Sequence, residues 1–252
     1  MSGAIDLNAD MGEYATDAQR DIEAALMPLI SSCSIACGGH AGDENTMRET
    51  ARLAKQHGVS IGAHPSYPDR EGFGRRGLSY DPEELAQSLS QQIAQLRSVL
   101  DAEDVPMNHL KPHGALYNDA ANDASLAKII IRAAGTAGEK IIIVGPPGSM
   151  LEEGAKAAGY PFAAEGFFDR LYQPNGALTP RSEAGAIIKD ISARARQALA
   201  IARGDTLQLT NGTLRLEVQT LCIHSDSPGA VETANAARAA LNADGFEIRA
   251  FK

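Results

Sequence analysis

Short apolar runs alternate with longer amphipathic stretches along the whole chain. This alternation is typical of repeated β/α units and unlike separate all-β and all-α halves. Strands are predicted near residues 3–8, 31–37, 59–63, 107–111, 140–144, 161–165, 218–223 and 246–251. Helices are predicted between them, near 17–28, 43–57, 81–101, 122–137, 147–158, 181–203 and 228–243.

One segment, "TLQLTNGTLRLEV", interrupts this pattern. Asn211 and Gly212 form a two-residue turn signal between alternating runs, which predicts an inserted β-hairpin near 206–217. No low-complexity linker, charge block or tandem repeat divides the chain, so residues 1–252 are expected to form a single domain. Seven or eight β/α units predict an α/β fold of the TIM-like barrel type, seven-stranded or distorted. A doubly wound open sheet is the alternative, because periodicity does not show whether a sheet closes.

Composition narrows the possible partners. The 252 residues carry 23 lysines and arginines against 32 acidic residues, a formal charge of -9. Such a chain is a poor partner for nucleic acid or an anionic membrane surface. The N-terminal sequence lacks the features of a signal peptide, and no stretch approaches the ~18 apolar residues of a membrane span. A cytoplasmic protein is therefore expected, and the odd number of cysteines, Cys33, Cys37 and Cys222, indicates reduced core thiols.

Polar residues gather directly after the predicted strands, where the loops of a β/α barrel build an active site. In "HLKPHGALYN", His109, Lys111 and His113 alternate, so an extended strand would point all three to one side. His109 lies deeper and is either a wall residue or part of the site, whereas His57, before Gly58, is expected to end a helix. The other polar residues at strand ends are Asn8, Asp10, Glu13, His40, Asp43, His64, Asp69, Glu165, Asp169, Arg170, His224 and Asp226.

Five of these residues, Asp10, His40, His64, Lys111 and His113, are predicted to converge at one mouth of the barrel. Among them, Asp10, His40 and His64 offer an oxygen and two nitrogens from successive strand ends. A divalent metal ion would accept that set, with water completing its shell. A hydrogen-bonded acid and base cluster without metal is the alternative.

Two glycine-containing segments could serve a ligand. "REGFGRRG", residues 70–77, carries Arg75 and Arg76 and is either an anion clamp or lid, or a solvated surface loop. "GPPGSM", residues 145–150, precedes a helix whose free N–H groups could hold an anion. The sequence contains no Walker-type loop, no dinucleotide fingerprint after a strand and no GxSxG elbow.

Six segments together resemble the LamB/YcsF family, in order and over nearly the whole chain: "IDLNADMGE", "SCSIACGGHAGD", "IGAHPSYPDREGFGRRG", "LKPHGALYN", "EGFFDRLYQPNGALTPR" and "CIHSDSP". The resemblance implies a barrel related to the glycoside hydrolase and deacetylase barrels, usually seven-stranded. Members of the family act as the A subunit of bacterial 5-oxoprolinase. The resemblance therefore also implies ATP-dependent opening of 5-oxoproline (pyroglutamate) to L-glutamate, with Mg-ATP as co-substrate and with two further subunits, B and C.

The family pattern singles out particular residues of this sequence. Among them, the residues expected to be catalytic are Asp10, Glu13, His64, Lys111, His113 and Asp169. The residues expected to bind substrate are Asn8, Arg75, Arg76, Asn118, Arg170 and His224. His40, Asp43, Glu165, Arg181 and Asp226 complete the pattern. The sequence departs from it at Ala9, Phe168 and Ser225, where Cys, Ala and Gly are frequent. Ala9 argues against a cysteine nucleophile, and Ser225 could shift His224.

A small lactam with one carboxylate suits these residue types. Its site needs a cation for the acid, a donor for the lactam oxygen and a group that moves protons at the ring bond. Lys111 and Arg170 are expected to hold the anion, and Asp10 or His113 to activate water. Lys111→Met is expected to abolish turnover with little effect on the fold, and the isolated chain is expected to show little activity without its partners. A metal-dependent carbohydrate or N-acetyl hydrolase and a non-catalytic subunit that binds small acids are the alternatives.

Overall fold

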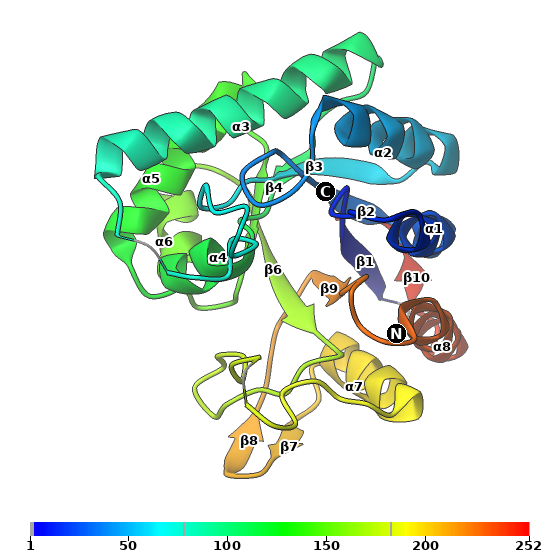
Figure 1. Cartoon of the computed structure of the whole chain (residues 1–252). Helices are drawn as coiled ribbons and strands as arrows, with labels where there is room; N and C mark the ends of the chain where they lie inside the picture. Colours follow the sequence, from blue (N-terminus) through cyan, green and yellow to red (C-terminus); the bar gives the residue numbers. More distant parts are fainter. Residues whose placement is uncertain (1–2, 78, 182, 252) are drawn as a thin grey trace.

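The computed structural model describes residues 3–77, 79–181 and 183–251. Parallel strands form the centre of the molecule, and helices cover their outer side (Figure 1). The sheet closes into a barrel because β9 pairs both with β6 and with the first strand, β1. The seven strands of the barrel are β1 (Ala4–Met11), β2 (Ser32–Ala36), β3 (Ser60–His64), β4 (His109–Leu110), β5 (Ile142–Gly145), β6 (Phe162–Phe167) and β9 (Thr220–Ile223).

Closure confirms the predicted TIM-like barrel with seven strands, and the open-sheet alternative is wrong. A further strand, β10 (Glu247–Ile248), pairs with Ala4 and Ile5, just before the part of β1 that β9 joins. It lies beside the beginning of β1 and does not widen the barrel. The predicted hairpin is also confirmed, since β7 (Leu207–Leu209) and β8 (Gly212–Leu214) pair antiparallel.

The helices begin where the sequence supplies caps. In α3 the Asp81 side chain accepts hydrogen bonds from the first-turn N–H groups, and Pro82 occupies the first position. In α2 the last residue is His57, and Gly58 follows with a φ of 68°, as predicted for a helix end. The helices are α1 (Asp17–Leu26), α2 (Glu44–His57), α3 (Pro82–Ala102), α4 (Gly114–Ala120), α5 (Ala124–Ala134), α6 (Met150–Ala157), α7 (Ile191–Arg203) and α8 (Ala230–Ala243), with 3₁₀ turns η1 (Met27–Leu29) and η2 (Gly135–Ala137).

Two differences from the sequence prediction affect the site. The helix predicted over 181–203 begins only at Ile191, where Asp190 caps it. The loop before it folds back on the end of β6 through a bridge between Arg170 and Ile187, and Gly185, with a φ of 87°, interrupts any helix there. The short helix α4, directly after "HLKPH", has no counterpart among the predicted helices.

The interior of the barrel is partly polar. Asp6, near the start of β1, accepts hydrogen bonds from three hydroxyl groups, among them that of Thr220. Thr220 accepts in turn from the amide of Asn8, which also donates to Glu165. A hydrogen-bonded column therefore runs through the barrel from Asp6 to the residues at its mouth.

Asp6 should make the stability of the protein depend on pH. Burial raises the pKa of Asp6 from 3.8 to about 6, against the opposing effect of its hydrogen bonds. Because the folded chain then binds this proton more tightly than the unfolded chain, stability is lost as the pH rises from about 4 to about 6. The loss amounts to about 3 kcal/mol. We expect Asp6→Asn to remove it, as measured by urea unfolding across that range. An unchanged pH slope in the variant would contradict this account.

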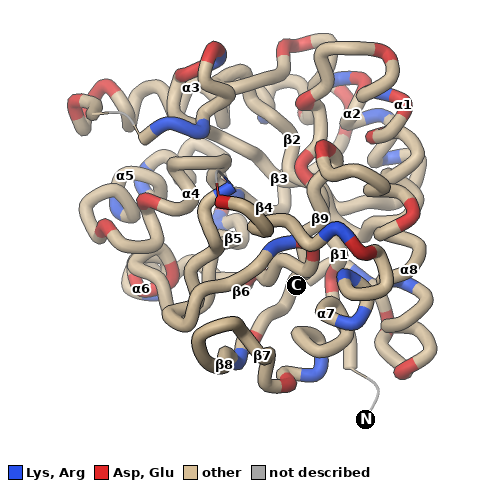
Figure 2. The backbone as a smooth tube through the Cα atoms, turned by 60° about the horizontal axis from the view of Figure 1, so that its bottom comes forward, with Lys and Arg blue, Asp and Glu red and all other residues tan. Residues whose placement is uncertain are grey.

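The thiols are buried, and many charged residues lie on the outer helices. Cys33, Cys37 and Cys222 are buried free cysteines, as predicted. Figure 2 shows basic and acidic residues mixed along the outer helices. Within the part of the chain that the structure describes, no helix has the length and apolar character that crossing a membrane requires.

Candidate active site

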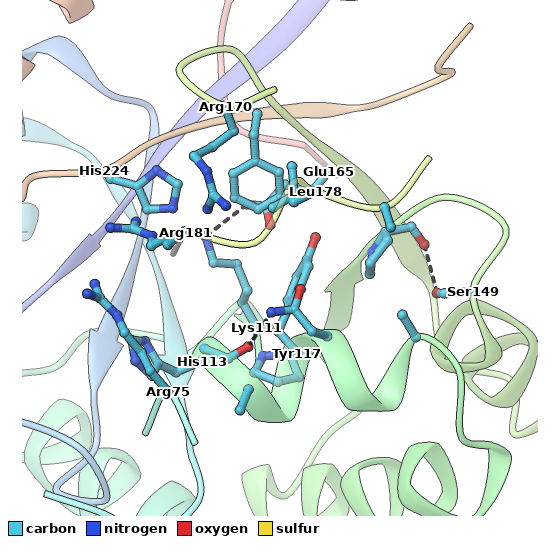
Figure 3. Close-up of a pocket in the computed structure, with 18 of the residues that line it drawn as sticks. Arg75, Lys111, His113, Tyr117, Ser149, Glu165, Arg170, Leu178, Arg181 and His224 are labelled. Atoms are coloured by element: carbon cyan, nitrogen blue, oxygen red, sulfur yellow. Dashed lines mark hydrogen bonds and ion pairs between the residues drawn. The ribbon is translucent and has the colours of Figure 1, made fainter. Parts of the chain in front are cut away.

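A cavity of about 620 Å³ opens at the carboxyl ends of the barrel strands. Its size is in the range of small-molecule sites. Figure 3 shows Arg170, Arg181 and His224 grouped on one side, near Lys111 and Tyr117, with Ser149 farther away. The side chains that line it come from the ends of β1, β3, β4, β6 and β9, from α4 and from the loops that follow β3, β5 and β6.

The five residues predicted to converge do lie together. Lys111 is buried, and its ammonium nitrogen lies 2.7 Å from Asp10 Oδ1. Asp10 Oδ2 lies 3.4 Å from Nε2 of His64, which is 3.0 Å from Nδ1 of His113. The His40 ring stacks flat on that of His113, with 3.6 Å between the ring centroids. The barrel therefore brings residues from β1, β2, β3 and β4 to one mouth.

Lys111 is held between two carboxylates. Besides Asp10, it contacts Glu165 Oε1 at 2.8 Å and donates to the side-chain oxygen of Asn8 at 3.0 Å. Burial favours the neutral amine, but Asp10 and Glu165 raise the pKa of Lys111 well above its usual range. Lys111 is therefore charged, and its charge is already paired with carboxylates inside the protein. The expectation that Lys111 itself holds a substrate anion loses support, because its donors are engaged inside the protein.

Glu13 lies at the centre of a histidine cluster. Its Oε1 is 2.7 Å from Nε2 of His40, 3.2 Å from Nδ1 of His113 and 3.7 Å from Nε2 of His64. Its backbone is fixed by Glu23 of α1, whose carboxylate accepts from the N–H groups of Gly12 and Glu13. One ligand atom from each of Glu13, His40, His64 and His113 lies within 4.8 Å of the others. The metal ligands predicted from the sequence are Asp10, His40 and His64. Of these, His40 and His64 belong to this cluster, and Asp10 lies beside it.

On the other side of the mouth, Asp169 and His224 form a pair that can transfer protons. Nδ1 of His224 lies 2.9 Å from Oδ2 of Asp169, and that oxygen also accepts from the Ser227 hydroxyl at 2.9 Å. Burial opposes ionisation, but His224 and Ser227 lower the pKa of Asp169 to about 2. An ionised Asp169 fixes the hydrogen of His224 on Nδ1. The other ring nitrogen, Nε2, is then available as a base, and His224 lines the cavity.

Three arginines give this side of the cavity a net positive charge. Arg75 and Arg181 both contact one oxygen of Asp226, at 2.7 and 3.0 Å. Arg170 is buried and donates to the backbone carbonyl of Thr179 at 2.6 Å. Two guanidinium groups therefore share one carboxylate, and the third is bonded to a neutral oxygen. This arrangement can attract and orient a small anion.

Other candidates lie at the edge of the site or away from it. Arg76 pairs with Asp69 at 3.0 Å and is not among the residues that line the cavity. Asn8 lies beneath Lys111, and Asn118 of α4 lines the cavity. His109 contacts the Ser34 hydroxyl through Nε2 at 3.2 Å, inside the barrel and below the mouth, where burial lowers its pKa to about 3. This position agrees with a wall residue.

The segment "GPPGSM" lines the cavity, but the N–H groups at the start of α6 already donate to side chains of the protein. The Gly148 N–H donates to the Glu152 carboxylate at 2.7 Å, and the Glu152 N–H donates to the Ser149 hydroxyl. An anion at the start of α6 would have to displace a carboxylate, so the structure gives no support to an anion site there.

Tyr117 is a site residue that the sequence pattern does not single out. Tyr117 lines the cavity, and its buried hydroxyl, which lies close to Glu165, makes no hydrogen bond of good geometry to the described residues. Burial and the neighbouring Glu165 raise the pKa of Tyr117 well above its usual range, so the phenol stays protonated. The signal available is its place in "HGALYN", one helical turn after His113, but recognising it requires the unpredicted helix α4.

Comparisons with known proteins agree with the fold and the motifs. The chain is 42% identical to the A subunit of 5-oxoprolinase from Methylococcus capsulatus, covering 99% of this chain and 96% of that protein. It is also 42% identical to the protein of that name from Thermus thermophilus, covering 98% and 99%. The crystal structure of a lactam utilization protein, likewise from Thermus thermophilus, superposes with a TM-score of 0.89 at 41% identity, covering 98% of this chain and 100% of that one.

A more distant structure shares only the fold. The catalytic domain of a peptidoglycan N-acetylglucosamine deacetylase from Eubacterium rectale superposes with a TM-score of 0.54 at 11% identity, covering 100% of this chain and 90% of that one. The family model described as the LamB/YcsF family matches residues 5–252, nearly the whole chain. Together with the full-length relatives, this match shows that the chain belongs to the LamB/YcsF family.

Proposed function

We propose that this protein is the A subunit of an ATP-dependent 5-oxoprolinase. The complex would convert 5-oxo-L-proline to L-glutamate while ATP is hydrolysed to ADP and phosphate, with subunits B and C as partners. The proposal is supported by full-length relatives that carry this name at 42% identity. The cytoplasm supplies ATP and keeps thiols reduced, which suits the three buried free cysteines.

One observation carries the proposal at the level of chemistry: a single cavity combines an arginine-rich side with an Asp–His pair and the phenol of Tyr117. 5-Oxoproline presents a carboxylate and a neutral lactam. In the proposed pose, Arg170 and Arg181, with Arg75, hold the carboxylate. The Tyr117 hydroxyl then donates to the lactam oxygen.

The Asp169–His224 pair is proposed to move the protons. The lactam is unstrained and stable in water, so ATP would first transfer a phosphoryl group to the amide oxygen, releasing ADP. Water attacks the ring carbon while His224 Nε2 takes its proton, and the ring C–N bond then breaks as the nitrogen is protonated. A second water hydrolyses the resulting acyl phosphate to glutamate and phosphate.

The test is to assay the chain with and without its partners. Because the sequence has no Walker-type loop and the start of α6 is occupied by Glu152, we expect the isolated chain to bind Mg-ATP weakly and to release no glutamate. Calorimetric titration with Mg-ATP and a glutamate-release assay, each with and without subunits B and C, provide the measurement. Robust glutamate release by the single chain would contradict the proposal that turnover requires subunits B and C.

Tyr117→Phe tests the proposed contact with the lactam oxygen. The variant keeps the ring and removes only the hydroxyl, which makes no hydrogen bond of good geometry to the described residues, so the fold should change little. Loss of one hydrogen bond of about 1 kcal/mol predicts a several-fold to tenfold fall in kcat/KM of the complete complex. Tyr80→Phe, on a tyrosine that stacks on Tyr67 and does not line the cavity, is the matched control. Equal kinetics of wild type and Tyr117→Phe would remove Tyr117 from the mechanism.

The Glu13 and histidine cluster favours a second candidate, a metal-dependent carbohydrate or N-acetyl hydrolase. Deacetylation of acetylated sugars by the chain alone, without ATP or partners, would select this function. A protein that only binds small acids for the complex is the third possibility. It would be selected if Asp169 and His224 variants left turnover of the complete complex intact.

A further inference from the structure

Two imidazole rings in the mouth point nitrogens at each other. Nδ1 of His64 lies 2.8 Å from the carbonyl oxygen of Lys111, and Nε2 of His113 lies 2.9 Å from the carbonyl oxygen of Phe73. A carbonyl oxygen only accepts hydrogen bonds, so each of these outer nitrogens carries a hydrogen. In neutral rings the inner nitrogens, 3.0 Å apart, therefore both carry lone pairs.

Two facing lone pairs repel each other unless a cation lies between or beside them. The nearest further groups are also electron-pair donors. Glu13 Oε1 is 3.2 Å from the inner nitrogen of His113 and 3.7 Å from that of His64, and Asp10 Oδ2 is 3.4 Å from the inner nitrogen of His64. These residues are buried or nearly so, and a buried lone pair that has no partner raises the free energy of the folded state. Within the chain itself, only an extra proton on one imidazole could relieve this arrangement.

The way these side chains are held matches metal coordination better than proton sharing. Each imidazole has its outer N–H fixed by a backbone carbonyl, the support that orients metal-ligating histidines. The three donors come from three separate strand ends, β1, β3 and β4, and Glu13 is fixed in turn by Glu23. Two nitrogens and one carboxylate form a set that zinc accepts in catalytic sites, with one position left open.

We propose that Glu13, His64 and His113 bind one divalent cation of the zinc type. All three line the cavity, as does Asp10, so the open coordination position would face the ligand space beside Asp10. His40 does not line the cavity. It contacts Glu13 through Nε2 at 2.7 Å and stacks on His113, so it is a positioning residue.

This assignment changes the set expected from the sequence. Asp10 is displaced from the ligand set because one oxygen pairs with Lys111 and the other lies 3.4 Å from His64. A bound divalent ion would polarise an oxygen atom of a ligand in the cavity. The inference goes beyond the proposed function, because metal binding is a property of the isolated chain and holds for any substrate.

Metal binding can be tested on the full chain without substrate. The chain is stripped with a chelator, then titrated with Zn²⁺ by calorimetry and with Co²⁺ by visible absorption, and its metal content is measured by mass spectrometry. We expect one ion per chain and a Co²⁺ spectrum typical of four- or five-coordinate nitrogen and oxygen ligation. His64→Asn and His113→Asn should each weaken binding more than about 100-fold. His40→Asn should weaken it about 10- to 100-fold while one ion per chain is retained.

Two controls and one further ligand variant make the result decisive. His57→Asn, on the exposed end of α2, and His224→Asn, across the same cavity, should leave Zn²⁺ affinity unchanged. Glu13→Gln keeps the shape of the side chain and serves if a histidine variant fails to fold. The proposal is overturned if no ion binds, if binding is insensitive to Glu13, His64 and His113, or if ¹⁵N spectra of the metal-free and metal-treated chain show one proton shared by the two imidazoles. Absence of 5-oxoprolinase activity would count against the proposed function and leave the metal result standing.

Discussion

Lys111→Met should lower the free energy of unfolding by about 3–5 kcal/mol and also abolish turnover of the complete complex. The lysine is 2% exposed and lies within 3 Å of carboxylate oxygens of both Asp10 and Glu165. Its removal leaves two buried negative charges without a counter-ion. Urea unfolding at neutral pH measures the loss of stability. The sequence alone indicates only a loss of activity, and the burial of the ammonium group changes that expectation.

A second variant separates charge from packing at this position. In Lys111→Met combined with Glu165→Gln, one of the two negative charges is removed together with the lysine. We expect the double variant to be more stable than Lys111→Met alone and to remain inactive. If the single variant is destabilised by less than about 1 kcal/mol, the ion pairs contribute no more than exposed ones do, and this account is wrong.

Asp169→Asn should lower kcat of the complete complex by about 10²- to 10⁴-fold, the usual contribution of a positioned proton-transfer group. The asparagine side chain would keep the shape but not the charge, so the hydrogen on Nδ1 of His224 would no longer be fixed. KM should change little, because Arg75 and Arg181, which help to hold the carboxylate in the proposed pose, pair with Asp226. Steady-state kinetics with subunits B and C present provide the measurement.

The Asp169–His224 pair should act as a unit. We expect Asp169→Asn combined with His224→Gln to be no slower than His224→Gln alone, because each change disables the same proton transfer. Ser227→Ala removes one hydrogen bond to Asp169 and should cost far less than Asp169→Asn. Additive losses in the double variant would show that Asp169 and His224 act separately.

The strand-end residues of the site are predictable because a parallel barrel has a simple rule. Each strand delivers the side chains at its carboxyl end to the same face, so the order of "NADMGE", "GGHAGD", "GAHPS" and "LKPH" along the chain is enough to expect convergence. The hairpin at Asn211 and Gly212 is predictable for a similar reason, since its turn signal is local.

The electrostatic state of the same residues is not predictable from the sequence. Whether Lys111 is free or paired depends on Glu165, which lies 54 residues away, and the tautomer of His113 depends on a carbonyl oxygen of Phe73 in the glycine-rich loop. Helix α4 (7 residues) escapes prediction because it is short and begins only three residues after the strand. The loop before α7 is wrongly predicted as helix because its polar residues resemble a solvated helical face. These features depend on contacts that form only once the barrel has closed.

Closure of the barrel through β1 and β9 also has a consequence for how the chain folds. The first strand pairs with residues 220–223, so one of its edges stays unpaired until most of the chain has been synthesised. Until then β1 and β6 present unpaired backbone groups at the two ends of a partly formed sheet, and such edges promote association between chains. Strands so far apart in the sequence pair slowly, because the chain loses the entropy of loop closure before the stabilising contacts form. Newly made protein should therefore depend on chaperones more than its final stability would suggest.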